Sequence, residues 1–226
     1  MRPARSALLA LTVTLALLLA LIACPAGAQE VPELYQAGTY ESTGLYYGVS
    51  AYVEVPSPLP TVRPGTYSRC YVEMRAPGTS VPAFIQVGWN VGELDGYAYS
   101  APVEFVHYHD TAGNSKVVVI GPPTPGTRPC YRIEWVPSTG TWKVSKNNVA
   151  VGSFKVFPAP GVSVAEGETS HPENVMGPSH FDQVMYATMY SVLSWYPFHP
   201  GCPLYADPPY RITGKPSSFF VSGPYW

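Results

Sequence analysis

Short segments in which apolar and polar residues alternate, separated by proline and glycine, are the feature that most constrains the fold. In the segment 47–55 every second residue is tyrosine, valine or alanine, and Pro56-Ser57-Pro58 follows directly. Similar segments, also bounded by turn residues, are 67–75, 83–91, 97–108, 115–120, 130–136, 141–145, 149–156, 162–169 and 180–188. Because successive side chains of a strand face opposite sides of a sheet, this alternation favours half-buried strands over helices. The pattern predicts an all-β chain: an antiparallel β-sandwich of the jelly-roll, concanavalin-like type with little or no helix.

The first 28 residues are predicted to be an export signal rather than part of the fold. Arg2 and Arg5 form a basic start, residues 8–22 are apolar, and Ala26-Gly27-Ala28 has the small residues of a cleavage site. A lipoprotein signal is the alternative, because Leu21-Ile22-Ala23-Cys24 is similar to a bacterial lipobox and would place a lipid on Cys24. A retained transmembrane helix is disfavoured, since the apolar run is short for a full span. The protein is therefore expected to be secreted or held in the cell envelope, attached to a membrane only through a lipid on Cys24.

The remaining 198 residues are enough for a single domain, and the β-sandwich itself is predicted over residues 45–190. An N-terminal lead-in over 29–44 precedes it. A tail over 191–226, rich in proline and tyrosine, is expected to be irregular and to pack on one edge of the domain. Beyond the signal, 11 basic residues stand against 15 acidic ones without a basic stripe, so nucleic acid is not an expected partner. The low charged fraction of 12% is compatible with an acidic milieu.

Three cysteines follow the signal, and export permits disulfides. Cys70 and Cys130 lie on predicted strands and are the preferred pair, while Cys202, in a Pro-Gly-Cys-Pro loop, is an alternative partner for either. A thiolate metal site is not expected, because no CxxC spacing occurs. His107 and His109 share a strand face beside Asp110, but no third ligand stands at motif spacing, so no metal is expected there either.

Polar residues in two predicted strands are the candidates for chemistry. Gln86 stands among apolar residues, with Phe84 and Gly88 on its own face of the strand. Glu166 and Glu168 share a face of the segment 162–169, where mutual repulsion raises one pKa and keeps a carboxyl group poised for proton transfer. Taken singly, each signal has a simpler structural explanation: a glutamine hydrogen-bonded within the sandwich, and an acidic edge facing solvent.

Together these motifs resemble those of the glutamic peptidases. Phe84-Ile85-Gln86-Val87-Gly88-Trp89-Asn90-Val91 is similar to the I-E/Q-x-G-W-x-V strand of neprosin-like proteins, and Tyr47-Gly48-Val49-Ser50-Ala51-Tyr52-Val53-Glu54-Val55 is similar to an upstream strand of that group. Gly167-Glu168, followed by His171 and Met176-Gly177-Pro178-Ser179-His180-Phe181, resembles their downstream block. The resemblance covers about residues 45–190.

One position departs from the neprosin-like pattern, which uses two glutamates. Gln86 stands where the first of these would be, and a Gln/Glu dyad is instead what eqolisin-like peptidases use, also on a β-sandwich. The A-E-W-I strand of eqolisins aligns better with Ala165-Glu166 than with Gly167-Glu168. The resemblance therefore favours Glu168 by its distance to the downstream block and keeps Glu166 as the alternative.

The resemblance implies an exported, acid-acting endopeptidase whose partner is a polypeptide substrate and which needs no cofactor. Glu168, or alternatively Glu166, would act as general base on a water and then as general acid toward the leaving amine. The side-chain amide of Gln86 would hold the same water and then donate to the tetrahedral oxyanion. The residues implied to line the peptide groove are Trp89, Tyr97 and Tyr99.

A second hypothesis, from a different class, is a non-catalytic lectin-like sandwich that binds carbohydrate or another surface. The 17 tyrosines and 5 tryptophans, which stack on sugars, favour it, as does the loss of the first glutamate. A retaining glycosidase is less favoured, because no E-x-D-x-x-E triplet is present. The positions of the side chains distinguish the peptidase from the binding module, since Gln86 on the opposite face of the sheet from Glu166 and Glu168 would exclude the peptidase.

Overall fold

Antiparallel β-sheets make up the part of the chain that the structure describes, residues 34–78 and 83–224 of a computed structural model. These residues contain sixteen strands and no helix, so the predicted all-β sandwich is confirmed. Within the same ranges, nothing has the length and apolar character of a membrane-spanning helix. The predicted export signal and Cys24 lie outside the described residues.

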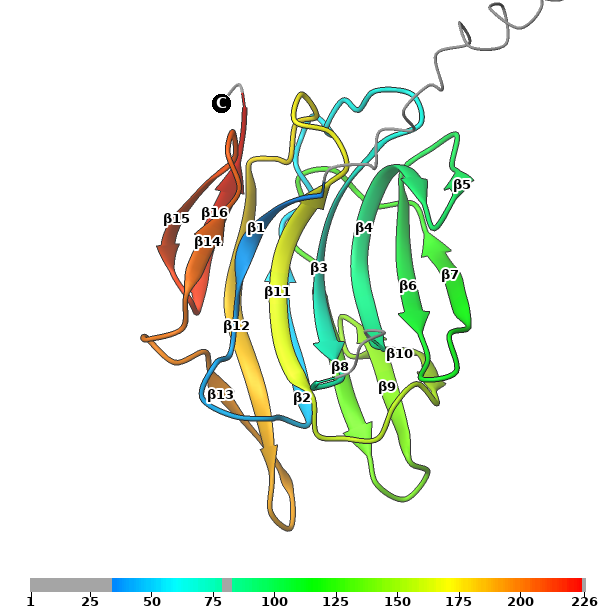
Figure 1. Cartoon of the computed structure of the whole chain (residues 1–226), viewed down its shortest axis with the longest axis vertical. Coiled ribbons are helices and arrows are strands. Elements are labelled where there is room, and N and C mark those ends of the chain that lie inside the picture. Colours follow the sequence, from blue (N-terminus) through cyan, green and yellow to red (C-terminus); the bar gives the residue numbers. More distant parts are fainter. Residues whose placement is uncertain (1–33, 79–82, 225–226) are drawn as a thin grey trace, which may run out of the picture. The chain divides into compact units, whose positions relative to one another are not determined.

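Two sheets carry all the strands of this described part. In spatial order the first sheet holds β14 (Leu204–Ala206), β1 (Tyr35–Tyr40), β11 (Val162–Thr169), β3 (Tyr67–Arg75), β4 (Phe84–Leu94), β6 (Val103–His109) and β7 (Ser115–Gly121), with β5 (Tyr97–Ala98) paired to β4. The second sheet holds β10 (Val149–Phe154), β9 (Thr141–Lys146), β8 (Cys130–Val136), β2 (Gly48–Val53), β12 (Ser179–Met189), β16 (Ser218–Ser222) and β15 (Arg211–Lys215), with β13 (Leu193–Pro197) paired to β12. Figure 1 shows them as layers, with β11, β3, β4 and β6 in front of β2, β8 and β9.

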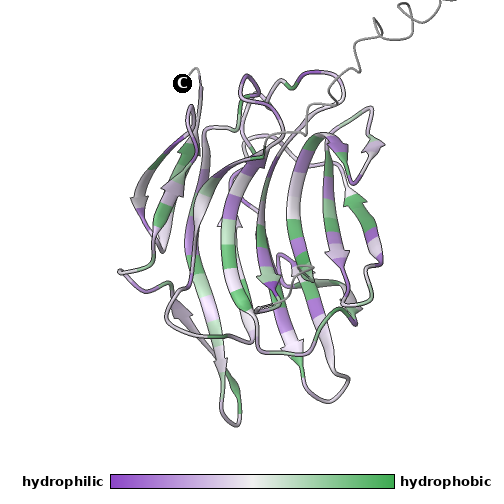
Figure 2. Cartoon of the chain, viewed as in Figure 1, coloured by the Kyte–Doolittle hydropathy of each residue, from purple (hydrophilic) through white to green (hydrophobic). Residues whose placement is uncertain are grey.

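The core lies between the layers and is built from alternate residues of their strands. The inward residues of β3, β4, β2 and β8 are fully buried or nearly so; they include Val72, Met74, Ile85, Val87, Val49, Ala51, Tyr131 and Ile133. Figure 2 shows the matching bands of hydrophobic and hydrophilic residues along the strands of the front sheet. Each large apolar side chain buried in this way stabilises the fold by about 1.5–3 kcal/mol. The alternation leaves the other face of the first sheet to polar residues.

The sheets extend beyond the predicted domain limits of 45–190. β1 lies within the predicted lead-in, and β13 to β16 lie within the tail that was predicted to be irregular. Their sequences lack a run of alternating apolar residues, so their strand character comes from backbone pairing with strands already in place. β1 pairs along its whole length with β11, and β16 pairs with β12. The tail therefore completes the edge of both sheets.

The predicted disulfide between Cys70 and Cys130 is wrong, because all three described cysteines are free. Cys70 faces the core from the first sheet, in register with the inward Trp89. Cys130 precedes the inward Tyr131 on β8, so strand alternation turns its thiol to the outer face of the second sheet, where it contacts Ser50 Oγ at 3.6 Å. Cys202 Sγ instead donates to Glu41 Oε2 at 3.1 Å.

Alkylation of these three thiols is expected only after unfolding. Burial raises the pKa of Cys70 well above its usual range, and burial together with the hydrogen bond to Glu41 raises the pKa of Cys202 to about 11. Since the thiolate is the reactive form, both should resist iodoacetamide in the native protein. Mass spectrometry after alkylation in denaturant, without reductant, should find Cys70, Cys130 and Cys202 modified. Failure of any two to react until a reductant is added would contradict the structure.

Candidate active site

The outward face of the first sheet gathers the polar residues of β11, β3, β4 and β6. Directly paired residues of adjacent strands point to the same side. Glu166 is paired with Tyr71, Glu168 with Arg69, and Gln86 with Glu73, so Gln86 and both glutamates of β11 share one face. Gln86 on the opposite face would have excluded a peptidase, and the pairing rules this arrangement out. Gln86, Glu166 and Glu168 are only 3%, 1% and 2% exposed, and half-buried side chains border them: Gln36, Tyr67, Arg75, Phe84 and Tyr205.

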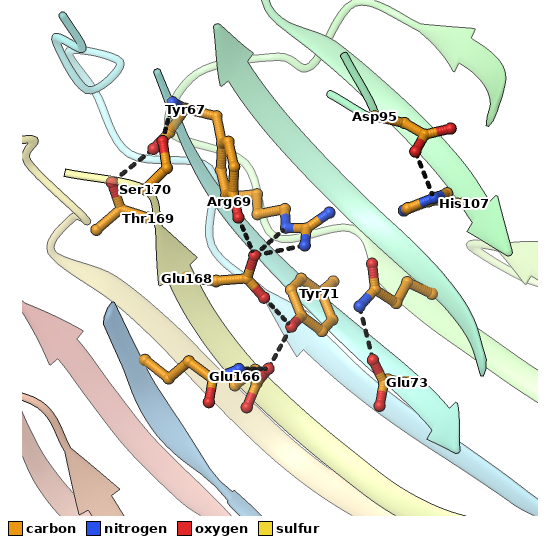
Figure 3. Close-up of polar contacts among 12 residues, drawn as sticks. Tyr67, Arg69, Tyr71, Glu73, Asp95, His107, Glu166, Glu168, Thr169 and Ser170 are labelled. Atoms are coloured by element: carbon orange, nitrogen blue, oxygen red, sulfur yellow. Dashed lines mark hydrogen bonds and ion pairs between the residues drawn. The ribbon is translucent and has the colours of Figure 1, made fainter. Parts of the chain in front are cut away.

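Glu168 is the anionic half of a buried ion pair. Its Oε1 accepts from Arg69 Nε at 3.0 Å and also from Arg69 Nη2 and the Tyr67 hydroxyl, and its Oε2 accepts from the Tyr71 hydroxyl at 2.6 Å (Figure 3). Burial by itself raises the pKa of Glu168, but the charge of Arg69 and the hydroxyl donors outweigh burial and hold the pKa below its usual range. Glu168 is therefore a carboxylate whose oxygens are already occupied, which makes it a weak base.

Glu166, two residues earlier on the same strand, has the opposite electrostatic setting. No cation contacts its carboxyl group within the described part of the chain, and its hydrogen-bond partners are neutral groups: the amide of Gln36, at 3.1 Å, and the hydroxyls of Tyr71 and Tyr205. Burial, with the negative charges of Glu73 and Glu168, raises the pKa of Glu166 to about 7. Glu166 therefore keeps its proton through the acid range.

The hydrogen bonds of Tyr71 also indicate that Glu166 is protonated and Glu168 is ionised. Its hydroxyl contacts Glu166 Oε1 and Glu168 Oε2 at once but has a single proton to donate. The contact network is satisfied when Tyr71 donates to the ionised Glu168 and accepts from a protonated Glu166. Geometry and pKa thus agree that the pair holds one proton, and that it resides on Glu166.

Gln86 is held by a third carboxylate, Glu73, which the sequence did not single out. Gln86 Nε2 donates to Glu73 Oε2 at 2.6 Å, and Glu73 Oε1 accepts from Arg75 Nε in an ion pair. One amide hydrogen of Gln86 is thereby used, and the second is left for a ligand. The signal for Glu73 was present in the alternation of β3, but only the β3–β4 register places Glu73 opposite Gln86.

The residues predicted to line a peptide groove separate into two groups. Trp89 is wrong as a groove residue, because it is fully buried on the core face and its Nε1 donates to the Glu54 carbonyl at 3.0 Å. Tyr97 is 68% exposed at the end of the sheet, while Tyr99 is half-buried against the cluster of Tyr71, Leu94 and Phe105. Tyr97 and Tyr99 stay predictions.

Replacing Tyr71 by phenylalanine tests the shared proton. Loss of the hydroxyl leaves buried oxygens of Glu166 and Glu168 with one partner fewer, so the free energy of unfolding should fall by about 1–3 kcal/mol. Urea denaturation measures the loss. Tyr97→Phe, at an exposed hydroxyl, is the matched control; an equal effect in both variants would contradict the arrangement.

No family model and no curated protein matches this chain. Among solved structures, the fold is similar to that of scytalido-glutamic peptidase, determined with a transition state analog inhibitor, with a TM-score of 0.56 and 12% identity over 84% of this chain and 98% of that one. A Bacillus licheniformis beta-glucanase, with a TM-score of 0.41 and 13% identity, and a Bacteroides ovatus family 16 endo-glucanase, with 0.40 and 14%, overlap less. They cover 66% and 60% of this chain, and 69% and 66% of their own. The chain thus has a glutamic-peptidase-like β-sandwich fold.

Proposed function

We propose that this sandwich, whose fold is that of a glutamic peptidase, is an exported, acid-acting endopeptidase in which Gln86 and Glu166 form the catalytic dyad. The observation that carries the proposal is a buried carboxyl group with a pKa of about 7, Glu166, on the same sheet face as a buried glutamine that has an amide hydrogen to spare. Perturbed acids of this kind are characteristic of groups that transfer protons.

The choice of Glu166 over Glu168 follows from their neighbours. Arg69 and the two tyrosine hydroxyls stabilise the carboxylate form of Glu168, so it neither gives nor takes a proton readily. Glu166 lacks a cationic partner among the described residues and holds a proton that it can release. Glu168 then acts as the anchor of Tyr71, which fixes the position of Glu166.

Glu73 completes the proton transfers. Glu73 accepts two hydrogen bonds where Glu168 accepts four, and its partner Arg75 is 41% exposed where Arg69 is 10% exposed, so Glu73 keeps lone pairs for a proton. As a carboxylate beside Gln86 it accepts the proton of the attacking water, while the water oxygen bonds to the scissile carbonyl carbon. The free amide hydrogen of Gln86 stabilises the resulting oxyanion. Glu166 protonates the nitrogen of the leaving amine, and the C–N bond breaks. The proton gained by Glu73 and the one lost by Glu166 balance, and exchange with solvent restores the starting state.

Cleavage of a denatured protein at about pH 5 tests this function. Wild type should cleave, and Glu166→Gln and Glu73→Gln should each reduce kcat/KM by about 100-fold or more, as expected when a general acid or base is removed. Glu134→Gln is the matched control, because it makes the same carboxylate-to-amide change in an ion pair with Lys143 on the second sheet. No cleavage by wild type between pH 3 and 7, or full activity in Glu166→Gln, would overturn the proposal.

A further inference from the structure

Two hydrogen-bond acceptors without protein partners lie side by side on the face that carries Gln86. Gln86 on β4 is directly paired with His107 on β6, so their side chains share one face. Both are buried, at 3% and 7% exposed. Within the described part of the chain, Gln86 Oε1 and His107 Nδ1 have no hydrogen-bond partner. Buried polar atoms are rarely left unpaired, so two on one cross-strand pair indicate a ligand site.

The tautomer of His107 follows from the contacts of its other nitrogen. Nε2 lies 3.0 Å from Ser115 Oγ and 3.7 Å from Asp95 Oδ1, and Ser115 Oγ donates its one proton to Asp95 Oδ2 at 2.8 Å (Figure 3 shows His107 and Asp95). The hydroxyl of Ser115 can therefore only accept from the ring, which puts the hydrogen on Nε2. In the neutral imidazole Nδ1 then presents a lone pair.

The orientation of the Gln86 amide is fixed in a similar way. Glu73 pairs with Arg75 as a carboxylate and has no proton to donate, so the nitrogen of Gln86 must face it. The oxygen of Gln86 is consequently the atom left over. Each acceptor also has a carboxylate behind it, Glu73 behind Gln86 and Asp95 behind Ser115 and His107. Donation toward these anions strengthens the acceptor at the far end of each group.

We propose that Gln86 Oε1 and His107 Nδ1 form a subsite that binds a nitrogen carrying at least two hydrogens, either the primary amide of a substrate asparagine or glutamine or a substrate ammonium group. A nitrogen donating two hydrogen bonds of about 2.9 Å spans acceptors about 5 Å apart, and the Cβ atoms of directly paired residues such as Gln86 and His107 lie roughly 4.5–5.5 Å apart. The assignment to a polypeptide side chain rests on the proposed peptidase function.

His107 remains an acceptor in the acid range. Burial lowers its pKa to about 4, with the positive charge of Arg69 acting in the same direction and that of His109 more weakly, while Asp95 and Glu168 oppose them. The ring is thus neutral above about pH 4. Phe84 meets the ring edge to face at 5.0 Å and helps to hold its orientation. The subsite is therefore formed under the conditions at which the peptidase should act.

Nitrogen NMR of the histidine-labelled full-length protein at pH 6 tests the subsite without any need for catalysis. Acetamide and methylammonium each supply a nitrogen with two or more hydrogens, and N,N-dimethylacetamide is the matched probe without any. The Nδ1 resonance of His107, assigned by its absence in His107→Asn, should shift saturably with acetamide or methylammonium and not with the dimethyl compound. A shift with acetamide identifies an amide ligand, and a shift with methylammonium identifies an ammonium ligand. No saturable shift with either, or an equal shift with the dimethyl compound, would overturn the proposal.

Peptide cleavage supplies a second readout. The peptides form a series in which one position near the cleaved bond is glutamine, lysine or methionine, and each such position is varied in turn. At one of these positions the wild-type kcat/KM should be about tenfold or more higher for glutamine or lysine than for methionine. This preference should fall toward one in His107→Phe, which keeps an aromatic ring, and largely persist in His107→Asn, whose oxygen replaces Nδ1. A preference unchanged in His107→Phe would contradict the subsite. Absence of all cleavage with a positive NMR result would instead reject the peptidase and keep the subsite.

Discussion

Glu168→Gln is expected to lower the free energy of unfolding at pH 7 by about 3–5 kcal/mol, because it leaves the buried Arg69 guanidinium without a counter-charge. Arg69 lies between the rings of Tyr67 and Tyr71, at 4.9 and 5.1 Å from their centroids, and the rings alone cannot compensate a full charge. Urea denaturation followed by tryptophan fluorescence measures the loss. The low pKa of Glu168 means that the stability it provides is present above about pH 4.5 and disappears as the pH falls through that lowered value.

The double variant Arg69→Met, Glu168→Gln is the control for this effect. Removing both charges removes the uncompensated ion, so the double variant should be clearly more stable than Glu168→Gln alone. A loss below about 1 kcal/mol in Glu168→Gln would mean that the pair is solvated and behaves as a surface ion pair. In that case the assignment of Glu168 as an inert anchor would not hold.

Glu166→Gln should make the protein more stable at pH 8 while abolishing peptidase activity. The folded-state pKa of about 7 lies above the usual 4.5, so the folded state binds more protons between these values and wild-type stability falls as the pH rises through that window. The fall amounts to roughly 3 kcal/mol. Glutamine imitates the protonated acid, so the variant should equal wild type near pH 4 and exceed it at pH 8. Thermal unfolding from pH 4 to 8 measures this; parallel curves for wild type and variant would contradict a protonated Glu166.

Strand positions were readable from the sequence where alternation and turn residues coincided. The segments 67–75, 130–136 and 162–169 are identical in extent to β3, β8 and β11. The strands β1 and β13 to β16 were missed, because their residues give no alternating apolar signal and their conformation is determined by pairing with other strands. Alternation identifies which face a residue occupies, but it says nothing about which strand lies next to it.

The same limit applies to the site. Period-two alternation placed Glu166 and Glu168 on one face, yet their different roles depend on Arg69, 99 positions from Glu168, and on Tyr205 from the tail. Glu73 becomes a candidate site residue only because the β3–β4 register pairs it with Gln86. The error at Trp89 was avoidable, because alternation already puts Trp89 on the opposite face from Gln86. Sequence spacing thus identified the candidate acids, and tertiary pairing separated the carboxylate that is paired with Arg69 from the carboxyl group that keeps its proton.

The pH dependence of kcat/KM for hydrolysis of an unstructured peptide tests the central claim most directly. With Glu166 as the general acid, activity requires its protonated form, so kcat/KM should fall tenfold per pH unit above about 7. The fall should follow the carboxyl titration of Glu166 measured by NMR on the same protein. A rate that is constant through pH 7, or hydrolysis that begins to decline near the usual glutamate pKa of 4.5, would contradict the role assigned to Glu166.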